Sequence, residues 1–219
     1  MLLSAAVKDK SLKNFFIKRL SQKTAFIFIA VFFVFFAKHF KIHFLKSILT
    51  AQQLQITIKR LAHQVLENHV NLDETVLIGL QPRGVFLSDQ IVDEIKKETS
   101  PDKIQYGKLD ITFYRDDIRK ELHIANRTEI PFSIEGKNVV LIDDVLYTGR
   151  TIRAALDALL DFGRPEKVEL CVLIDRRFSR QLPIQPDYVG KSIDSILSQK
   201  IKVYWKIKDG KDEVIISNE

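Results

Sequence analysis

Two adjacent carboxylates, Asp143 and Asp144, follow an apolar run in the sequence VVLIDDVLYTGRT, residues 139–151. Such a run is typical of a strand that is buried on both faces of a parallel sheet. Successive side chains of a strand point to opposite faces, so both carboxylates can serve one ligand only if the strand ends there and the chain turns. In that position they could accept hydrogen bonds from two neighbouring hydroxyl groups.

The turn after the carboxylates has the composition of an anion site. Gly149 allows the backbone to approach a ligand closely. Residues 148–151 place amide hydrogens at the start of a predicted helix, where unsatisfied N–H groups and the helix dipole favour an anion. A sugar phosphate carries both the hydroxyls and the anion. In the alternative interpretation, the aspartates only cap a turn and Thr151 caps the helix.

Hydrophobic periodicity predicts strands that alternate with helices around this motif. Thr50 and Gln53 have the spacing of a capping box and precede a stripe of Leu54, Ile58, Leu61 and Val65, so a helix is expected over residues 50–68. Further helices are expected over residues 85–98 and from residue 151 to a stop at Gly163 and Pro165. Strands are expected over residues 74–80, 108–115, 139–142, 167–176, 202–207 and 212–217. This alternation indicates an α/β fold with a mainly parallel sheet flanked by helices.

The first 46 residues differ in composition from the rest of the chain. They hold 10 of the 15 Phe and nine basic residues against one acid, Asp9, whereas residues 47–219 carry 25 basic and 27 acidic residues. The net charge of +6 therefore comes from this leader and is no argument for nucleic-acid binding by the domain at residues 47–219.

The centre of the leader, residues 24–37, is apolar and uncharged. As a helix it would span about 21 Å, short of the ~30 Å hydrocarbon core of a bilayer. It also lacks the small residues of a signal-peptide cleavage site. Three interpretations stay open: a peripheral or re-entrant anchor, a targeting segment, or upstream sequence that is not part of the functional protein.

The single cysteine, Cys171, excludes an intramolecular disulfide and fits a reducing compartment such as the cytoplasm. Its apolar neighbours predict a core residue. The five histidines show no metal-ligand spacing, so no structural zinc is expected.

The motif at residues 139–151 resembles the signature that binds phosphoribosyl pyrophosphate (PRPP) in type I phosphoribosyltransferases. Together with IGLQPRGVFL, KLDITFYRDD, TIRAALDALLDFGRPEKVEL and LPIQPDYVGK, it resembles PyrR, the family of pyrimidine-operon regulators that are also uracil phosphoribosyltransferases. The resemblance covers about residues 47–219. It implies the type I phosphoribosyltransferase fold, with a small hood and a flexible loop, in a cytoplasmic homo-oligomer. Membrane attachment is expected only if the leader belongs to the functional protein.

The resemblance also implies the site residues. Arg83 would face the diphosphate, where charge develops as it leaves. The polar segment at residues 116–136 would act as a lid, and Arg115, directly before it, could reach the diphosphate when the lid closes. Asp143 and Asp144 would hold the ribose, and Mg²⁺ would arrive with PRPP. The residues expected to contact PRPP are Val139, Val140, Leu141, Ile142, Asp143, Asp144, Val145, Leu146, Tyr147, Thr148, Gly149, Arg150, Thr151, Pro82, Arg83 and Gly84. An ordinary β-turn at residues 81–84 and solvated charge at Asp116 and Asp117 remain the alternatives.

The implied reaction joins uracil to the ribose of PRPP, releases diphosphate and forms UMP. Tyr188 would lie against the pyrimidine ring and Val189 would offer backbone hydrogen bonds to its edge, unless Tyr188 is a plain strand aromatic. No general base is assigned. The PRPP signature does not specify the acceptor, so a phosphoribosyltransferase for another nucleobase, without an RNA-binding role, is the alternative.

The family further implies binding to the leader of a pyrimidine messenger RNA in response to UMP. The candidate contacts are Lys59, Arg60, His63, Arg180 and Lys191. Gln185 and Ser179 stand where the family pattern has basic residues, and Arg177-Phe178 looks inserted, so weaker RNA binding is expected. A solvated helix face is the alternative. An enzyme, an RNA-binding regulator and a membrane-attached protein therefore compete, and the first two are compatible.

Overall fold

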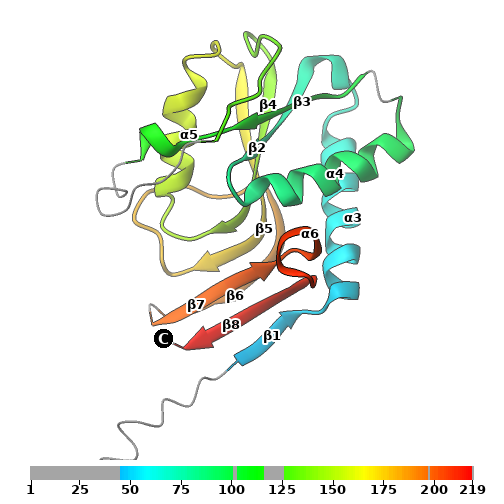
Figure 1. Ribbon diagram of the computed structural model, residues 1–219. Helices are drawn as coiled ribbons and strands as arrows, with labels where there is room; N and C mark the ends of the chain where they lie inside the picture. Colours follow the sequence, from blue (N-terminus) through cyan, green and yellow to red (C-terminus); the bar gives the residue numbers. More distant parts are fainter. Residues whose placement is uncertain (1–44, 101–102, 116–125, 197, 219) are drawn as a thin grey trace, which may run out of the picture. The chain divides into compact units, whose positions relative to one another are not determined.

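A five-stranded parallel sheet lies at the centre of the computed structural model, which describes residues 45–100, 103–115, 126–196 and 198–218. The strands lie in the order β3-β2-β4-β5-β6, and every neighbouring pair is parallel (Figure 1). They are β2 (Thr75–Leu80), β3 (Gln105–Leu109), β4 (Asn138–Leu146), β5 (Lys167–Arg177) and β6 (Tyr188–Asp194). Strand β4 is therefore the central one, with its carboxyl end at the expected ligand edge of the sheet.

Helices cover both faces of this sheet. Helices α3 (Ala51–Asn68) and α4 (Gly84–Glu98) contribute to one hydrophobic cluster, and α5 (Arg150–Leu159) contributes to the other. Alternate residues of β4 divide between the clusters: Val140 and Ile142 face α3 and α4, whereas Val139 and Leu141 face α5. This burial on both faces explains why β4 reads as a continuous apolar run.

Helix α3 begins at the predicted capping box. The backbone N–H of Gln53 donates to Oγ1 of Thr50, and the backbone N–H of Thr50 donates to Oε1 of Gln53 at 3.0 Å. The predicted stripe is confirmed, because Leu54, Ile58, Leu61 and Val65 are all buried.

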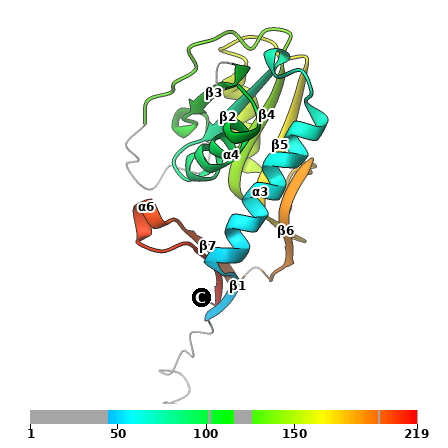
Figure 2. The same cartoon turned by 90° about the vertical axis from the view of Figure 1, so that its right-hand side faces the viewer.

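A second sheet, which we call the hood, has three antiparallel strands in the order β1-β8-β7. These strands are β1 (Leu45–Leu49), β7 (Gln199–Tyr204) and β8 (Glu213–Asn218), with the short helix α6 (Lys206–Asp209) between the last two. Helix α3 extends from the hood to the parallel sheet (Figure 2). It therefore connects the two sheets through packing as well as through the chain.

The structure corrects the predicted elements in several places. The strand expected over residues 139–142 is β4, which continues to Leu146, so the expectation that this strand ends at the aspartates is wrong. The strand expected over residues 108–115 is β3, and it stops earlier because the carboxylate of Asp110 accepts the backbone N–H of Thr112 at 2.8 Å; the short 3₁₀ helix η3 (Thr112–Tyr114) follows. The strand expected over residues 202–207 is β7, which ends at Tyr204. Strands β1 and β6 were not among the expected strands.

Residues Phe44–Glu219 form one compact unit. No helix in the described part of the chain is long and apolar enough to cross a membrane. Of the leader expected over residues 1–46, residues 1–44 lie outside the described residues, whereas Leu45 and Lys46 belong to β1. Asp116 and Asp117 also lie outside the described residues.

Candidate active site

Strand β4 carries both aspartates to the carboxyl edge of the parallel sheet. It pairs with β2 on one side and β5 on the other. Asp143 and Asp144 are only 8% and 9% exposed, and the backbone N–H of Asp144 donates to Oδ1 of Asp143 at 2.9 Å. Ligands of open α/β sheets bind outside the carboxyl ends of the strands. Two buried carboxylates thus lie where a ligand is expected.

Burial raises the pKa of both carboxyl groups. The charge of Asp144 raises the pKa of Asp143 further, to well above its ordinary range, and the positive charge of Arg115 opposes this effect. The guanidinium of Arg83, whose Nε lies 3.4 Å from Oδ2 of Asp144, opposes the rise there. The two arginines do not fully offset the effect of burial on the carboxyl groups. A ligand that brings hydroxyl groups or a cation would therefore stabilise the charged pair.

The aspartate pair fits a Mg²⁺ ion that is held mainly by its substrate. Mg²⁺ is commonly bound through one or two carboxylates together with phosphate oxygens and water. Within the described residues, no group of three or more His, Cys, Asp or Glu side chains could hold a metal ion by itself. Asp143 and Asp144 are therefore the residues that would contact a Mg²⁺ brought by a phosphorylated ligand.

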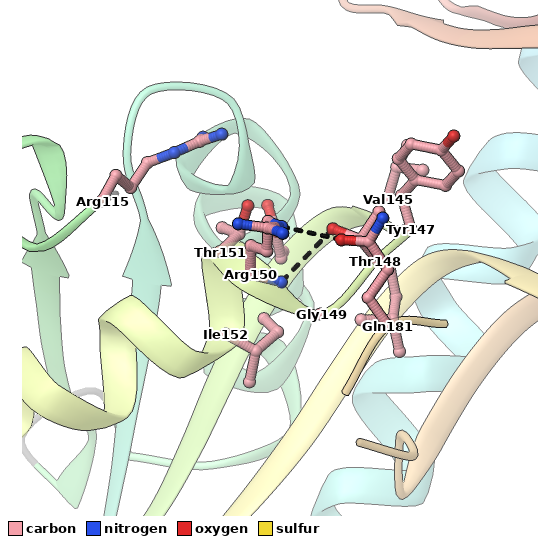
Figure 3. A pocket seen from close by; sticks show the side chains of 11 residues that line it. Arg115, Val145, Tyr147, Thr148, Gly149, Arg150, Thr151, Ile152 and Gln181 are labelled. Atoms are coloured by element: carbon pink, nitrogen blue, oxygen red, sulfur yellow. Dashed lines mark hydrogen bonds between the residues drawn. The ribbon is translucent and has the colours of Figure 1, made fainter. Parts of the chain in front are cut away.

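A cavity of about 340 Å³ lies beside the aspartates, at the start of α5 (Figure 3). Gly149 precedes α5 with φ +92°, a conformation that favours glycine, and a Cβ there would lie only 3.2 Å from the Ile184 side chain. The first N–H groups of the ten-residue helix α5 have no helical partners. The residues that line the cavity are Arg115, Asp143, Val145, Leu146, Tyr147, Thr148, Gly149, Arg150, Thr151, Ile152 and Gln181. This is the arrangement of a phosphate site next to a hydroxyl-binding site.

Two arginines from other elements approach the site. Arg115, directly after η3, lines the cavity on the side opposite Tyr147 (Figure 3). Arg83 precedes α4, and a Cβ on the next residue, Gly84, would lie 2.7 Å from the carbonyl oxygen of Ile142, so glycine allows α4 to start against β4. The Arg83 guanidinium also donates to the carbonyl oxygen of Val203 in the hood. Contact of either arginine with a diphosphate stays a prediction.

The structure corrects part of the predicted PRPP set. Val139, Val140, Leu141 and Ile142 are completely buried in the two clusters, so their side chains cannot contact a ligand. They support the site by fixing β4 in the sheet. The later residues of the motif, 145–151, do line the cavity together with Asp143.

Gln181 is a cavity residue that the sequence did not reveal. Its Oε1 accepts from Nε of Arg150 at 2.8 Å, and its backbone N–H donates to the carbonyl oxygen of Thr148 at 3.0 Å. Gln181 lies in the irregular segment between β5 and β6, 30 residues from the phosphate loop. No local pattern marks such a residue, because only the tertiary fold brings it to the loop.

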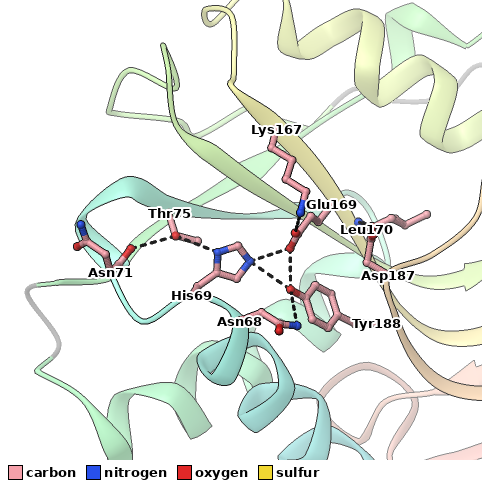
Figure 4. A network of polar contacts seen from close by, with 9 residues as sticks. All are labelled: Asn68, His69, Asn71, Thr75, Lys167, Glu169, Leu170, Asp187 and Tyr188. Carbon is pink, nitrogen blue, oxygen red and sulfur yellow. Dashed lines mark hydrogen bonds and ion pairs between the residues drawn. The ribbon is translucent and has the colours of Figure 1, made fainter.

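The structure corrects the predicted role of Tyr188 as a base contact, whereas the predicted backbone contact of Val189 stays a prediction. Tyr188 is 3% exposed, and its hydroxyl donates to Glu169 at 2.6 Å (Figure 4). It begins β6, opposite Cys171 in the middle of β5, so its side chain packs with the cluster on the α3 side. The carbonyl oxygen of Val189 accepts from Nη2 of Arg60 at 3.1 Å. Neither residue lines the cavity.

The candidate RNA contacts divide into two groups. Lys59, Arg60 and His63 are exposed on α3, although Arg60 also donates to the Gly190 carbonyl oxygen at 2.6 Å. Lys191 is exposed, and its Nζ donates to the Ile48 carbonyl oxygen at 3.1 Å.

Arg180 is the exception, and its assignment is corrected. Its guanidinium donates to the carbonyl oxygens of Leu146, Tyr147, Arg176 and Ile184, and it forms an ion pair with Asp175. Its donors are occupied in holding the loop after β4, so Arg180 has a structural role.

Comparisons with known proteins agree with this geometry. The family described as "Phosphoribosyl transferase domain" matches residues 45–208. "Bifunctional protein PyrR" of Elusimicrobium minutum is 45% identical over 174 residues, which cover 78% of this chain and 96% of that protein. The protein of the same name from a Picosynechococcus species is 48% identical over 169 residues, covering 77% and 94%. The predicted resemblance is thereby confirmed.

Solved structures support the fold. A hypoxanthine phosphoribosyltransferase of Staphylococcus aureus superposes with a TM-score of 0.60 at 21% identity, covering 80% of this chain and 92% of that one. At this level of identity the likeness concerns the fold alone. The predicted fold class is confirmed.

Proposed function

Because the chain belongs to the PyrR family of phosphoribosyltransferases, we propose that it transfers the ribose 5-phosphate of PRPP to uracil, forming UMP and diphosphate, and that it also binds RNA in response to UMP. The observation that carries the enzymatic part is the cavity at the start of α5, where the buried Asp143 meets the phosphate loop; the second buried aspartate, Asp144, follows it in β4. PRPP presents a 5-phosphate, two ribose hydroxyls and a diphosphate, and each has a complementary group in the chain.

The proposed contacts follow the order of these groups along PRPP. The backbone N–H groups of residues 148–151 hold the 5-phosphate at the start of α5. Asp143 and Asp144 accept the two ribose hydroxyls, and the gain in hydrogen bonds offsets the cost of their burial. Arg115 and Arg83 approach the diphosphate, where their charge stabilises the leaving group.

The reaction breaks the bond between C1 of the ribose and the diphosphate oxygen and forms a bond between C1 and N1 of uracil. The proton of N1 passes to the released diphosphate or to water. Mg²⁺, when bound with PRPP, would supply charge stabilisation of the departing diphosphate. The chain contributes mainly position, because holding sugar and acceptor in reacting geometry removes much of the entropic barrier.

The test is conversion of a panel of nucleobases to monophosphates by the full chain with PRPP and Mg²⁺. We expect turnover of uracil alone. Turnover of hypoxanthine or guanine instead of uracil would support phosphoribosyl transfer but show that the acceptor base is a purine. PRPP binding without turnover of any base would make the cavity a sensor and would refute the enzymatic proposal.

RNA binding is supported by the exposed cations of α3. Phosphate contacts dominate nucleic-acid affinity, and Lys59 and His63 lie on one exposed side of this helix. We expect Lys59→Ala to weaken binding of a pyrimidine messenger leader and to lower the salt dependence of the binding constant by about 0.7–0.9 in logarithmic slope. Lys96→Ala, at an exposed position of α4, is the matched control. Unchanged affinity in the Lys59 variant would remove α3 from the RNA surface.

A further inference from the structure

A buried arginine lies between the phosphate loop and the hood. Arg176, near the end of β5, is 5% exposed. Its Nε donates to Oγ of Ser195 at 2.9 Å, and its Nη2 donates to the carbonyl oxygen of Gln199 at 2.8 Å. The guanidinium lies over the ring of Tyr147, 4.0 Å from the ring centre. One side chain thus contacts the PRPP loop on one side and the connection from β6 to the hood on the other.

The neighbouring arginines show that this arrangement is specific to Arg176. Arg177 is more than half exposed and forms a surface ion pair with Asp194 at 2.7 Å. Arg180 binds the backbone carbonyl oxygen of Tyr147 but not its ring. Arg176 forms no ion pair with a carboxylate in the described part of the chain. Its hydrogen bonds and its ring contact therefore determine its position.

Tyr147 lies on the side of the cavity where the acceptor base has to enter. Displacement at C1 requires the nucleophile and the leaving group to lie on opposite faces of the sugar. Arg115, proposed above as a diphosphate contact, and Tyr147 lie on opposite sides of the cavity (Figure 3). The base therefore belongs on the Tyr147 side, between the loop and the hood, and Arg176 is the side chain that joins these two walls.

We propose that Arg176 is a positioning residue for the acceptor, which it serves by fixing the Tyr147 ring relative to the hood. This inference rests on the proposed phosphoribosyl transfer. The 5-phosphate and the ribose are held by other residues, so losing Arg176 should affect ligands that include the base and spare those that lack it.

The test compares UMP with ribose 5-phosphate by calorimetry on the full chain. Methionine has a similar length but lacks the charge and the donors, so in Arg176→Met we expect UMP to bind about 10- to 100-fold more weakly, with ribose 5-phosphate affinity unchanged within twofold. In steady-state kinetics, KM for uracil should rise while KM for PRPP stays near the wild-type value. Arg177→Met is the matched control and should change neither affinity.

Two milder variants separate positioning from folding. Arg176→Lys keeps the charge and should recover part of the UMP affinity, and Ser195→Ala removes only the partner of Nε and should weaken UMP binding by a few-fold. Equal weakening of UMP and ribose 5-phosphate, or no weakening of either, overturns the inference. A wild-type chain that binds both ligands but does not convert uracil would instead overturn the proposed function, while the comparison of the two ligands still decides the role of Arg176.

Discussion

Acidic side chains are buried at both ends of the parallel sheet, but their pKa values are raised at the carboxyl end and lowered at the amino end. At the carboxyl end, burial and mutual repulsion raise the pKa of Asp143, and Asp144 has Arg83 as its partner at 3.4 Å. At the amino end, Glu169 is 6% exposed, yet hydrogen bonds from Lys167, Tyr188 and His69 overcome the effect of burial and lower its pKa to about 2.

The network around Glu169 shows what a satisfied buried carboxylate looks like. Oε2 of Glu169 lies 2.7 Å from Nε2 of His69 and 2.6 Å from the Tyr188 hydroxyl, and Lys167 binds Oε1 (Figure 4). Nδ1 of His69 lies 3.2 Å from the Thr75 hydroxyl. Such a network stabilises one folded arrangement without any ligand. The contrast teaches that buried acids whose pKa is raised mark a ligand site, whereas a buried acid whose pKa is lowered by its hydrogen-bond partners belongs to a structural network.

The largest effect is expected from Asp144→Asn. The neutral amide is a weaker acceptor for the hydrogen bond of a ribose hydroxyl and a weaker ligand for Mg²⁺ than the carboxylate. We therefore expect kcat/KM for UMP formation to fall by about 10²–10³-fold. Thermal stability should stay equal or rise, because a buried carboxylate with a raised pKa is removed. Steady-state kinetics and calorimetric unfolding measure the two effects, with Asp157→Asn on the exposed side of α5 as the control. If the variant lost stability as well as activity, Asp144 would have a structural role like that of Glu169, and the contrast between the two ends would be wrong.

Glu169→Gln should give the reverse pattern. The amide cannot satisfy the donors of Lys167 and Tyr188 as the carboxylate does, so we expect the free energy of unfolding to fall by about 1.5–3 kcal/mol. The rate of UMP formation by the folded protein should stay within twofold of wild type. Urea unfolding and kinetics on the same samples test this, and Glu166→Gln, at an exposed position nearby, is the control. Unchanged stability would mean that the network is not a structural device.

The pH dependence of stability sharpens the same contrast. The folded-state pKa of Glu169 is about 2, below its ordinary 4.5, so its contribution is present above pH 4.5 and is lost as the pH falls towards 2. We therefore expect the melting temperature of wild type to fall more steeply over this range than that of Glu169→Gln. The raised pKa of Asp143 has the opposite effect on stability. Its contribution favours the folded state at low pH and is lost as the pH rises. Parallel melting curves for the variant and wild type would contradict the assignment.

Much of the fold follows from local patterns in the sequence. The capping box and apolar stripe of α3, the buried strand β4 and the glycine turn before α5 each rest on neighbouring residues, and the structure contains all three. Strand β1 could not be recognised, because its partner β8 lies some 170 residues later in the chain and its own residues alternate weakly. The early end of β3 depends on one side chain, Asp110, which binds the backbone N–H of Thr112.

The sequence motif predicted which residues form the phosphate loop, but it did not predict all the residues that line the cavity. Residues 145–151 and Asp143 were identified by type and spacing, whereas Gln181 reaches the loop only through tertiary structure. Tyr188 shows the limit of positional inference. Its place in the sequence suggested a ligand contact, but the register of β6 against β5 turns its side chain to Glu169 and His69. Register is set by long-range pairing, which no local pattern reports.

The smallest effect is expected on the rate at which a thiol reagent labels Cys171, which tests which end of the parallel sheet opens first. It lies in β5 between the two ends, is completely buried, and burial raises the pKa of its thiol to about 12, so at pH 8 a thiol reagent should react only after local or global opening. We expect Glu169→Gln to accelerate labelling roughly in proportion to its loss of stability, because β5 and β6 lose their shared network. Asp144→Asn should label at the wild-type rate, and urea-unfolded protein should react with one thiol per chain. Equal acceleration in both variants would show that opening does not begin at the amino end. A rate that differs only for Glu169→Gln would show that the network around Glu169 keeps β5 closed and that the carboxylate of Asp144 does not contribute to this.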